Sequence, residues 1–305
     1  MNKINCKDIF GFSCDFAIPS FVDKNEHVPE IDKNYVFDEI TSKAILAGFA
    51  FNQRVLVQGM HGTGKSTHIE QIASRLNWPC LRVNFDSQIT RLDLVGKDII
   101  KIKDGKQITE FKEGILPFAI NNGIALVLDE YDAIRSDVSF IIQRLLENEG
   151  KFALLEENKV LTPHKNFRLF ATSNTLGDGD DLGIYHGANL INQAQMDRWN
   201  ILSSLNYLEE SQEIKILNKK LPNLSKIDKN LTQKMVQVAN FSRNAFKNSD
   251  LTSLMSLRTL LSWGKNIEIF KEINQAFKLS FLNKVAQDER IIVAEFYQRV
   301  FGVDL

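Results

Sequence analysis

The sequence predicts an α/β fold, with a parallel sheet core flanked by helices and a small C-terminal helical lid. A glycine-rich stretch, Gly59 to Ser66, lies between a short apolar run and a helical pattern. A second, continuous apolar run at 124–128 ends in two acids, as expected of a central parallel strand covered on both faces. From about Asn206 onward only helical spacing occurs. These observations predict an arm at 1–34, an α/β core at 35–205 and a helical lid at 206–305.

The composition is that of an ordinary globular chain, and it limits the expected partners. Of the 305 residues, 44% are hydrophobic and 25% are charged, and the formal net charge is −1. Because the surface is not basic overall, nucleic acid is not an expected partner. The sequence has no secretory signal pattern and no apolar run near the ~20 residues that span a bilayer. We therefore expect a soluble, cytoplasmic protein with no membrane partner.

The cysteine and histidine spacing predicts no metal site built from these residues. Cys6, Cys14 and Cys80 are odd in number and lack C-x-x-C spacing, so neither a disulfide nor a zinc knuckle is expected. The five histidines show no H-E-x-x-H or comparable spacing. The metal expected is Mg²⁺ carried by a nucleotide.

The first elements expected along the chain are the arm and one helix. Residues 1–34 show little periodicity, which indicates an irregular arm packed on the core. Residues 35–51 carry apolar side chains at helical spacing, and residues 54–58 have the pattern of a short buried strand. A helix and then a strand are thus expected to lead into the glycine-rich stretch.

The glycine-rich stretch fits the phosphate-binding pattern G-x-x-x-x-G-K-[ST] at every fixed position. In such a loop the glycines let the backbone turn its N–H groups toward phosphates, and the following helix, expected at 67–76, presents its positive end. Lys65 would reach the β- and γ-phosphates, and Ser66 would ligate Mg²⁺. A chance glycine-rich turn is the alternative, but the flanking strand and helix favour a site for ATP or GTP. Its expected residues are Gly59, Met60, His61, Gly62, Thr63, Gly64, Lys65, Ser66 and Thr67.

The rest of the core is expected to alternate strands, helices and hairpins. The dipeptide Asp104-Gly105 between alternating runs is a strong hairpin signal. The glycine- and aspartate-rich segment 175–192 is expected to form a mobile loop. The other elements expected are a strand at 79–85, a hairpin at 98–111, a helix at 137–148, a hairpin at 151–161 turning at Glu157-Asn158, and a strand at 167–172.

Three polar residues at strand ends are expected to complete the phosphate site. Asp129 would hold the Mg²⁺ shell opposite Ser66, and Glu130 would orient and polarise the attacking water. Two acids at a strand end are common without such a role, but the upstream loop favours it here. Asn174 ends the next strand and would point at the same γ-phosphate, because carboxyl ends of parallel strands share one edge. A simple strand-to-loop turn is the alternative for Asn174.

Two arginines could contact nucleotide from outside this edge. Arg198 follows the expected mobile loop, from where it could reach the nucleotide of a neighbouring subunit. Arg258 opens a helix of the lid. Either could instead be a surface ion-pair partner, and spacing does not decide between these roles. The lid helices are expected at 211–221, 231–246, 256–270 and 274–301, the last with a break.

These motifs resemble those of the AAA+ ATPases. Gly59–Ser66 resembles the Walker A motif and 126–130 the Walker B motif. The hairpins at 98–111 and 151–161 resemble the helix-2 insert and the hairpin before sensor 1 of the branch that includes MoxR proteins and chelatase motor subunits. The resemblance implies ATP and Mg²⁺ as cofactors, with Ser66 and Asp129 as metal ligands. It implies four catalytic residues: Glu130 of Walker B, Asn174 as sensor 1, Arg198 as arginine finger and Arg258 as sensor 2.

A more specific resemblance covers nearly the whole chain. It is to the ATPase (S) subunits of aerobic, ATP-dependent cobaltochelatases. Leu257 departs from that pattern, since the family usually has proline there, and the change would loosen the presentation of Arg258. The segments that carry the resemblance are 12–37 with His27–Asp32, 60–71, 91–98, 111–117 and 294–299.

The family implies a homo-oligomeric ring, usually a hexamer, with ATP at the interfaces and Arg198 acting in trans. It also implies a T subunit with an integrin-like metal-binding domain and a large N subunit that binds the corrin. The chain would then be the motor of a cobaltochelatase, driving Co²⁺ insertion into hydrogenobyrinic acid a,c-diamide in aerobic cobalamin biosynthesis.

Two other functions compete with that of a chelatase motor. The first is a MoxR-like AAA+ chaperone that remodels a partner with an integrin-like domain, and the segments 1–37 and 290–302 favour the chelatase over it. The second is a DNA-directed ATPase, which would need a basic, aromatic-bearing loop or an appended nucleic-acid domain. The sequence has neither.

Overall fold

The computed structural model describes residues 1–147, 150–175 and 191–305, so most of the loop predicted at 175–192 lies outside the described residues. The chain forms two compact units. The core unit comprises residues 1–32, 37–60 and 64–205, and the helical unit comprises residues 33–36, 61–63 and 206–305.

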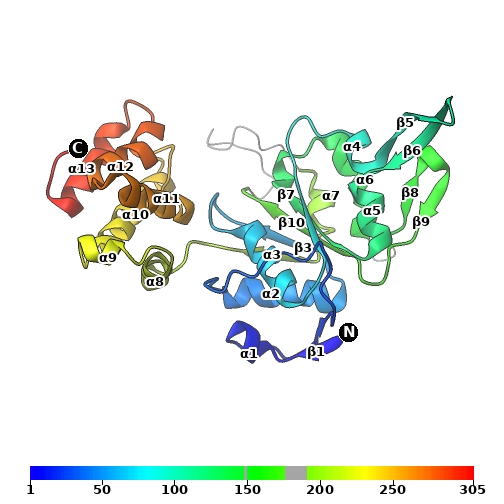
Figure 1. The fold of residues 1–305 in the computed structure, drawn as a ribbon, viewed down its shortest axis with the longest axis horizontal. Helices are drawn as coiled ribbons and strands as arrows, with labels where there is room; N and C mark the ends of the chain where they lie inside the picture. Colours follow the sequence, from blue (N-terminus) through cyan, green and yellow to red (C-terminus); the bar gives the residue numbers. More distant parts are fainter. Residues whose placement is uncertain (148–149, 176–190) are drawn as a thin grey trace. The chain divides into compact units, whose positions relative to one another are not determined.

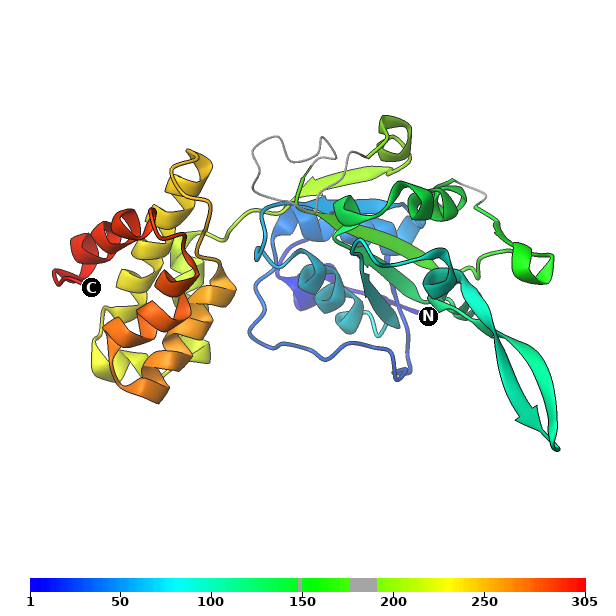
Figure 2. The same ribbon diagram turned by 90° about the horizontal axis from the view of Figure 1, so that it is seen from above.

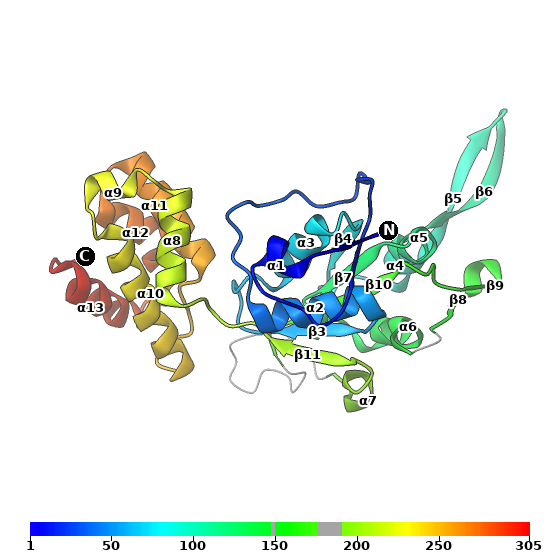
Figure 3. The same ribbon diagram turned by 90° about the horizontal axis from the view of Figure 1, so that it is seen from below.

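Five parallel strands form the main sheet of the core unit, in the order β11-β3-β10-β7-β4 (Figures 1 and 3). In the register, Gln58 lies opposite Ser173, and Asn84 lies opposite Asp129. The carboxyl ends of the strands therefore meet at one edge, which is where ligands bind in such sheets. This confirms the predicted α/β fold, although β11 was not predicted because it is too short for its pattern to differ from a loop. The strands are β3 Val55–Gln58, β4 Cys80–Asn84, β7 Ala125–Asp129, β10 Arg168–Ser173 and β11 Ile201–Ser204.

Helices cover both faces of this sheet, because alternate strand residues are apolar on both sides. Val55, Val127 and Phe170 belong to a buried cluster shared with α2 (Glu39–Phe51) and α3 (Lys65–Arg75). Leucines at the neighbouring positions, such as Leu56 and Leu126, belong to a second cluster shared with α5 (Ile115–Asn122) and α6 (Ser136–Leu146). Each fully buried side chain of this size contributes about 1.5–3 kcal/mol, so both layers hold the strands in place.

Two antiparallel hairpins extend from the core unit, and both were predicted. The longer pairs β5 (Gly96–Lys103) with β6 (Lys106–Glu113), and the shorter pairs β8 (Phe152–Leu154) with β9 (Lys159–Leu161). The longer one turns at Asp104 and Gly105, which both have positive φ, as a two-residue hairpin turn requires. Figures 2 and 3 show this hairpin standing away from the sheet. The side chains of Ile100 and Ile102, at alternate positions of β5, are exposed.

The N-terminal arm is only partly irregular. Its first twenty residues form short elements that were not predicted, whereas residues 21–34 form no helix or strand, as expected. Strand β1 (Asn2–Ile4) pairs with β2 (Ile18–Ser20), and helix α1 (Cys6–Phe10) lies between them in the chain. Helix α1 begins after Asn5, whose side chain accepts a hydrogen bond from the Lys7 N–H, and ends at Gly11 with a φ of 86°. These elements are too short to show periodicity in the sequence. They form because Cys6, Phe10 and Ile18 are buried in the core cluster beside α2 and β3.

The helical unit packs around a hydrophobic core of its own. Trp263, Phe277 and Tyr297 are fully buried in it, with the Trp263 and Phe277 ring centroids 4.8 Å apart. The expected break in the last helix separates α12 from α13, and α9 is a short addition. No helix in the described parts of the chain is both long and apolar enough to cross a bilayer. The helices are α8 Glu210–Lys220, α9 Leu224–Ile227, α10 Leu231–Lys247, α11 Leu257–Phe270, α12 Ile273–Ser280 and α13 Arg290–Phe301.

Two buried arginines lie at the edge of the sheet opposite the carboxyl ends. The Arg54 Nε donates to the Leu145 carbonyl and the Arg168 Nε to the Phe49 carbonyl, each at 2.8 Å. Leu145 and Phe49 lie in the last turns of α6 and α2, where carbonyls lack helix partners and carry partial negative charge. Burial, with Arg54 nearby, lowers the pKa of Arg168 to about 10. Within the described residues neither arginine pairs with an acid, so helix ends supply the compensating charge.

Candidate nucleotide-binding site

The glycine-rich loop joins the end of β3 to the start of α3 at the carboxyl edge of the sheet. Gly62 and Gly64 have φ of 74° and 91°, a left-handed backbone that glycine adopts without steric cost. The Gly59 N–H donates to the Ser173 carbonyl at 3.1 Å, which ties the loop to the end of β10. Helix α3 begins at Lys65, so its positive end lies at the loop. The curled backbone and helix start form the arrangement that binds phosphate groups.

Lys65 is buried and already held in place by oxygen atoms. Its Nζ donates to the carbonyls of Gly59 at 2.7 Å and Met60 at 3.0 Å, and to the Asn174 Oδ1 at 2.7 Å. Burial lowers the pKa of Lys65 to about 8, and the negative charges of Asp132, Asp129 and Glu130 oppose that shift. At pH 7 the ammonium form therefore still predominates, and it can pair with phosphate.

Ser66 and Asp129 form the pair of oxygen ligands that a Mg²⁺ ion would need. The Ser66 Oγ donates to the Asp129 Oδ1 at 2.6 Å, so a hydroxyl and a carboxylate oxygen lie side by side at the start of α3. The Thr172 hydroxyl donates to the same Oδ1, and the Arg82 Nε lies 3.0 Å from Oδ2. Hydroxyl and carboxylate oxygens are the ligands that Mg²⁺ prefers, so these residues fit the ion. The described residues hold no group of three or more His, Cys, Asp or Glu side chains that could bind a metal ion by themselves.

Glu130 follows Asp129 with an unusual backbone conformation. Its φ of 56° is left-handed, a conformation that costs a non-glycine residue on the order of 1 kcal/mol or more. Its N–H donates to the Thr172 Oγ1 at 3.2 Å, which holds the turn against β10. Partial burial, followed by the charges of Asp129 and Asp132, raises the pKa of the Glu130 carboxyl. A raised pKa makes this carboxylate a better proton acceptor, as a residue that activates water should be.

Asn174 is held at this edge by Asp132, a residue that the sequence did not single out. The Asp132 Oδ2 accepts from the N–H of Asn174 at 3.0 Å, and from the N–H and hydroxyl of Thr175 at 2.9 and 3.1 Å. Asp132 is 2% exposed, and its Oδ1 has no hydrogen-bond partner within the described residues. A single carboxylate oxygen thus fixes the turn that presents the Asn174 side chain to Lys65. An acid three positions after Asp129 could have been noticed, but its spacing alone does not reveal this contact.

Replacement of Asp132 by alanine is expected to lower kcat for nucleotide hydrolysis by about 10- to 100-fold, because a small displacement of a positioned group has effects of this size. KM should change little, since the loop and the two carbonyl contacts of Lys65 do not depend on Asp132. Steady-state kinetics of Asp132→Ala, with the exposed Asp137→Ala on α6 as the matched control, would measure this split. A folded Asp132→Ala variant with unchanged kcat would contradict the positioning role.

The two predicted arginines belong to other elements of the chain. Arg198 follows helix α7 (Gln193–Met196); its guanidinium donates to the Ala194 carbonyl and, in the described chain, pairs with no acid. Arg258 is exposed in the first turn of α11, in the helical unit, and makes no side-chain hydrogen bond to a described residue. Within one chain the structure thus brings together Lys65, Ser66, Asp129, Glu130 and Asn174. It does not bring Arg198 into contact with them.

Comparisons with known proteins agree with this geometry. The AAA domain (dynein-related subfamily) matches residues 54–184, which include both predicted motifs and Asn174. A second family, the CbbQ/NirQ/NorQ C-terminal domain, matches residues 213–294 in the helical unit. Residues 54–184 of the core unit are therefore similar in sequence to the AAA domain family.

Individual relatives match over most of their length. The chain is 53% identical to the aerobic cobaltochelatase subunit CobS of Sinorhizobium sp, over 99% of this chain and 91% of that protein. It is 21% identical to protein NorQ of Paracoccus denitrificans, over 88% of this chain and 91% of that protein. Among solved structures, the RuvB Holliday junction branch migration motor of Thermotoga maritima matches with a TM-score of 0.48 and 14% identity, over 85% of this chain and 69% of that one.

Proposed function

Because this chain belongs to the family of the aerobic cobaltochelatase subunit CobS, we propose that it is the ATP-hydrolysing subunit of a cobaltochelatase. The observation that carries the proposal is 53% identity over nearly the full length of both proteins, in a chain with a complete phosphate-binding edge. A MoxR-like chaperone is the weaker alternative, because the 53% identity is to a cobaltochelatase subunit. The substrate of the whole complex would be Co²⁺ together with a corrin, hydrogenobyrinic acid a,c-diamide.

The residues at the sheet edge suit ATP hydrolysis. The loop amides and the Lys65 ammonium would bind the β- and γ-phosphates, displacing the carbonyl partners that Lys65 has here. Ser66 and Asp129 would hold Mg²⁺, which when bound neutralises phosphate charge. Glu130 would accept a proton from the attacking water, and Asn174 would orient the γ-phosphate through its amide while Asp132 holds its backbone.

The proposal extends to the assembly. Arg198 lies on the surface of the core unit without an acid partner in the described chain, as suits a residue that acts on the nucleotide of the neighbouring subunit. A homo-oligomeric ring, expected to be a hexamer, would place ATP between subunits. The ring would work with a T subunit that has an integrin-like domain and a large corrin-binding N subunit. Arg258 would contact nucleotide from the helical unit.

The function is tested by reconstituting cobalt insertion. The purified chain is combined with the T and N subunits of a cobaltochelatase, Co²⁺, the corrin and ATP, and insertion is followed by the change in corrin absorption. We expect insertion only when this chain and ATP are both present, and none when Glu130→Gln replaces the wild-type chain. ATP hydrolysis without any insertion, using T and N subunits from the same source, would contradict the chelatase role and leave the ATPase role standing.

A further inference from the structure

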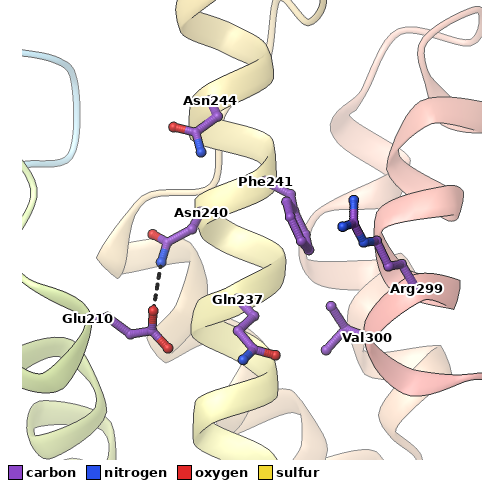
Figure 4. Close-up of a pocket in the computed structure, with 7 residues that line it drawn as sticks. All are labelled: Glu210, Gln237, Asn240, Phe241, Asn244, Arg299 and Val300. Atoms are coloured by element: carbon purple, nitrogen blue, oxygen red, sulfur yellow. Dashed lines mark hydrogen bonds between the residues drawn. The ribbon is translucent and has the colours of Figure 1, made fainter.

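One face of helix α10 lines an open groove in the helical unit that the nucleotide chemistry does not use (Figure 4). The groove has a volume of about 420 Å³, and none of its residues belongs to the predicted nucleotide site. Its lining comes from three helices: Glu210 of α8, Gln237, Asn240, Phe241 and Asn244 of α10, and Arg299 and Val300 of α13. We call it the α10 groove. Arg299 also closes the 294–299 segment, to which the hydrolysis mechanism assigns no role.

The floor of the α10 groove carries three carboxamide side chains, from Gln237, Asn240 and Asn244. A carboxamide offers one acceptor oxygen and two donor hydrogens, so it can bond to the main chain of a peptide whatever its sequence. From Asn240 to Asn244 the helix rises about 6 Å, close to the ~6.6 Å between alternate residues of an extended chain. The carboxamides can therefore bond to successive main-chain groups on one side of an extended peptide.

Asn240 is oriented for such a contact by its neighbours. Its Nδ2 donates weakly to the Glu210 Oε2 at 3.5 Å, and its Oδ1 accepts from the Arg243 Nη1 at 3.3 Å. Arg243 is fixed in turn by its two hydrogen bonds to the buried Glu213, at 2.8 and 3.0 Å. Both contacts of Asn240 are long, so each leaves hydrogen-bonding capacity for a ligand.

The α13 side of the groove presents a positive charge without an acid. The Arg299 guanidinium carbon lies 4.9 Å from the centroid of the Phe241 ring, which packs on Phe296 at 5.6 Å. Among the described residues Arg299 forms no ion pair and no side-chain hydrogen bond. An arginine held by an aromatic ring keeps its N–H groups available, and their planar arrangement matches a carboxylate. This side of the groove therefore favours an acidic group, whereas the Glu210 carboxylate on the α8 side would repel one, so the acid is expected at Arg299.

We propose that the α10 groove binds an extended peptide segment of a partner protein, with its main chain on the carboxamides of α10 and an aspartate or glutamate on Arg299. The carboxamides give affinity that does not depend on sequence, and Arg299 gives the preference for acid. This would be a docking site for a partner, separate from the residues that bind and hydrolyse nucleotide.

Peptide display on the full-length protein tests the proposal. A library of random dodecapeptides is selected in parallel on the wild-type chain and on Arg299→Gln, and enriched peptides are synthesised with a fluorophore for anisotropy titration. We expect the wild-type selection to enrich peptides that contain aspartate or glutamate. Their Kd should rise about 10-fold or more in Arg299→Gln, the scale of a lost bidentate ion pair. The matched control Lys265→Gln, which removes an exposed charge on α11, should leave Kd unchanged.

A second variant tests the carboxamides apart from the charge. The double replacement Gln237→Ala with Asn244→Ala should weaken every enriched peptide, including versions in which the acid is replaced by serine. Enrichment of the same peptides on Arg299→Gln, or equal affinity for all variants, would overturn the proposal. ATP hydrolysis measured on each variant should equal that of the wild type, which shows that the variants are folded. It also separates a failure of this proposal from a failure of the proposed ATPase function.

Discussion

Replacement of Lys65 by alanine is expected to weaken ATP binding by at least about 100-fold and to abolish hydrolysis. The reason is that Lys65 is the buried cation at the glycine-rich loop, with its Nζ within 3.0 Å of two loop carbonyls and the Asn174 side chain. Its ammonium exchanges those neutral oxygens for the charged oxygens of the triphosphate, and charge-assisted bonds of this kind are the stronger ones. Isothermal titration calorimetry with Mg²⁺ and ATP measures the loss directly.

Two controls make the Lys65 result interpretable. Lys112→Ala removes an exposed lysine from the β5–β6 hairpin and should bind ATP like the wild type. Lys65→Met keeps the side-chain length without the charge, and it should fail as Lys65→Ala does while its thermal unfolding stays cooperative. If clean, folded Lys65→Met protein bound ATP with wild-type affinity, the assignment of the whole phosphate site would be wrong.

Replacement of Glu130 by glutamine is expected to leave ATP binding nearly unchanged and to reduce hydrolysis by about 100-fold or more, the usual scale for losing a general base. The amide has the shape of the carboxylate but cannot accept the proton of the attacking water. The raised pKa of Glu130, caused by partial burial and then by Asp129 and Asp132, points to the same role. Calorimetry gives the affinity, and a phosphate-release assay gives the rate.

The same variant tests the role of Arg198 in trans. Rings that mix Glu130→Gln subunits with Arg198→Ala subunits should recover part of the activity, because some interfaces then combine an intact Glu130 with an intact Arg198. Each variant alone should hydrolyse ATP very slowly, and Glu295→Gln, an exposed change on α13, should behave as the wild type. Assembled mixed rings with no recovered activity would rule out a trans role for Arg198.

Local signals in the sequence were sufficient for the phosphate loop and for most of the core. Three features depend on residues that are adjacent in the chain, so their patterns predict them correctly: the glycine-rich loop, the apolar strand that ends at Asp129, and the turn at Asp104-Gly105. Helix α5 was not predicted, because Gly114 and Pro117 at its start are residue types that are typical of loops. The arm was predicted as irregular because its strands and helix form only against the core cluster.

The contacts within the site could not be predicted in the same way. Strands β4, β7 and β10 are neighbours in the sheet, and this brings Arg82 and Thr172 into contact with Asp129, and Asp132 into contact with Asn174. The order of strands in a sheet cannot be read from the local sequence pattern. The left-handed backbone of Glu130 was not expected either, since glutamate rarely adopts it. The sequence thus predicted which polar residues lie together at the strand ends, but not which residues hold those ends in position.

The buried arginines Arg54 and Arg168 have a consequence for how the core unit responds to nucleotide turnover. Through the Leu145 and Phe49 carbonyls, they fasten the ends of α6 and α2 to the sheet edge far from the phosphate loop. Exchange of ATP for ADP changes no charge at this edge of the sheet. Releasing either guanidinium from its carbonyl would leave a buried cation without a partner. The sheet edge that carries Arg54 and Arg168 should therefore keep its structure throughout the catalytic cycle. Conformational change during each turnover should then be confined to the opposite edge, at the turns that carry Glu130 and Asn174.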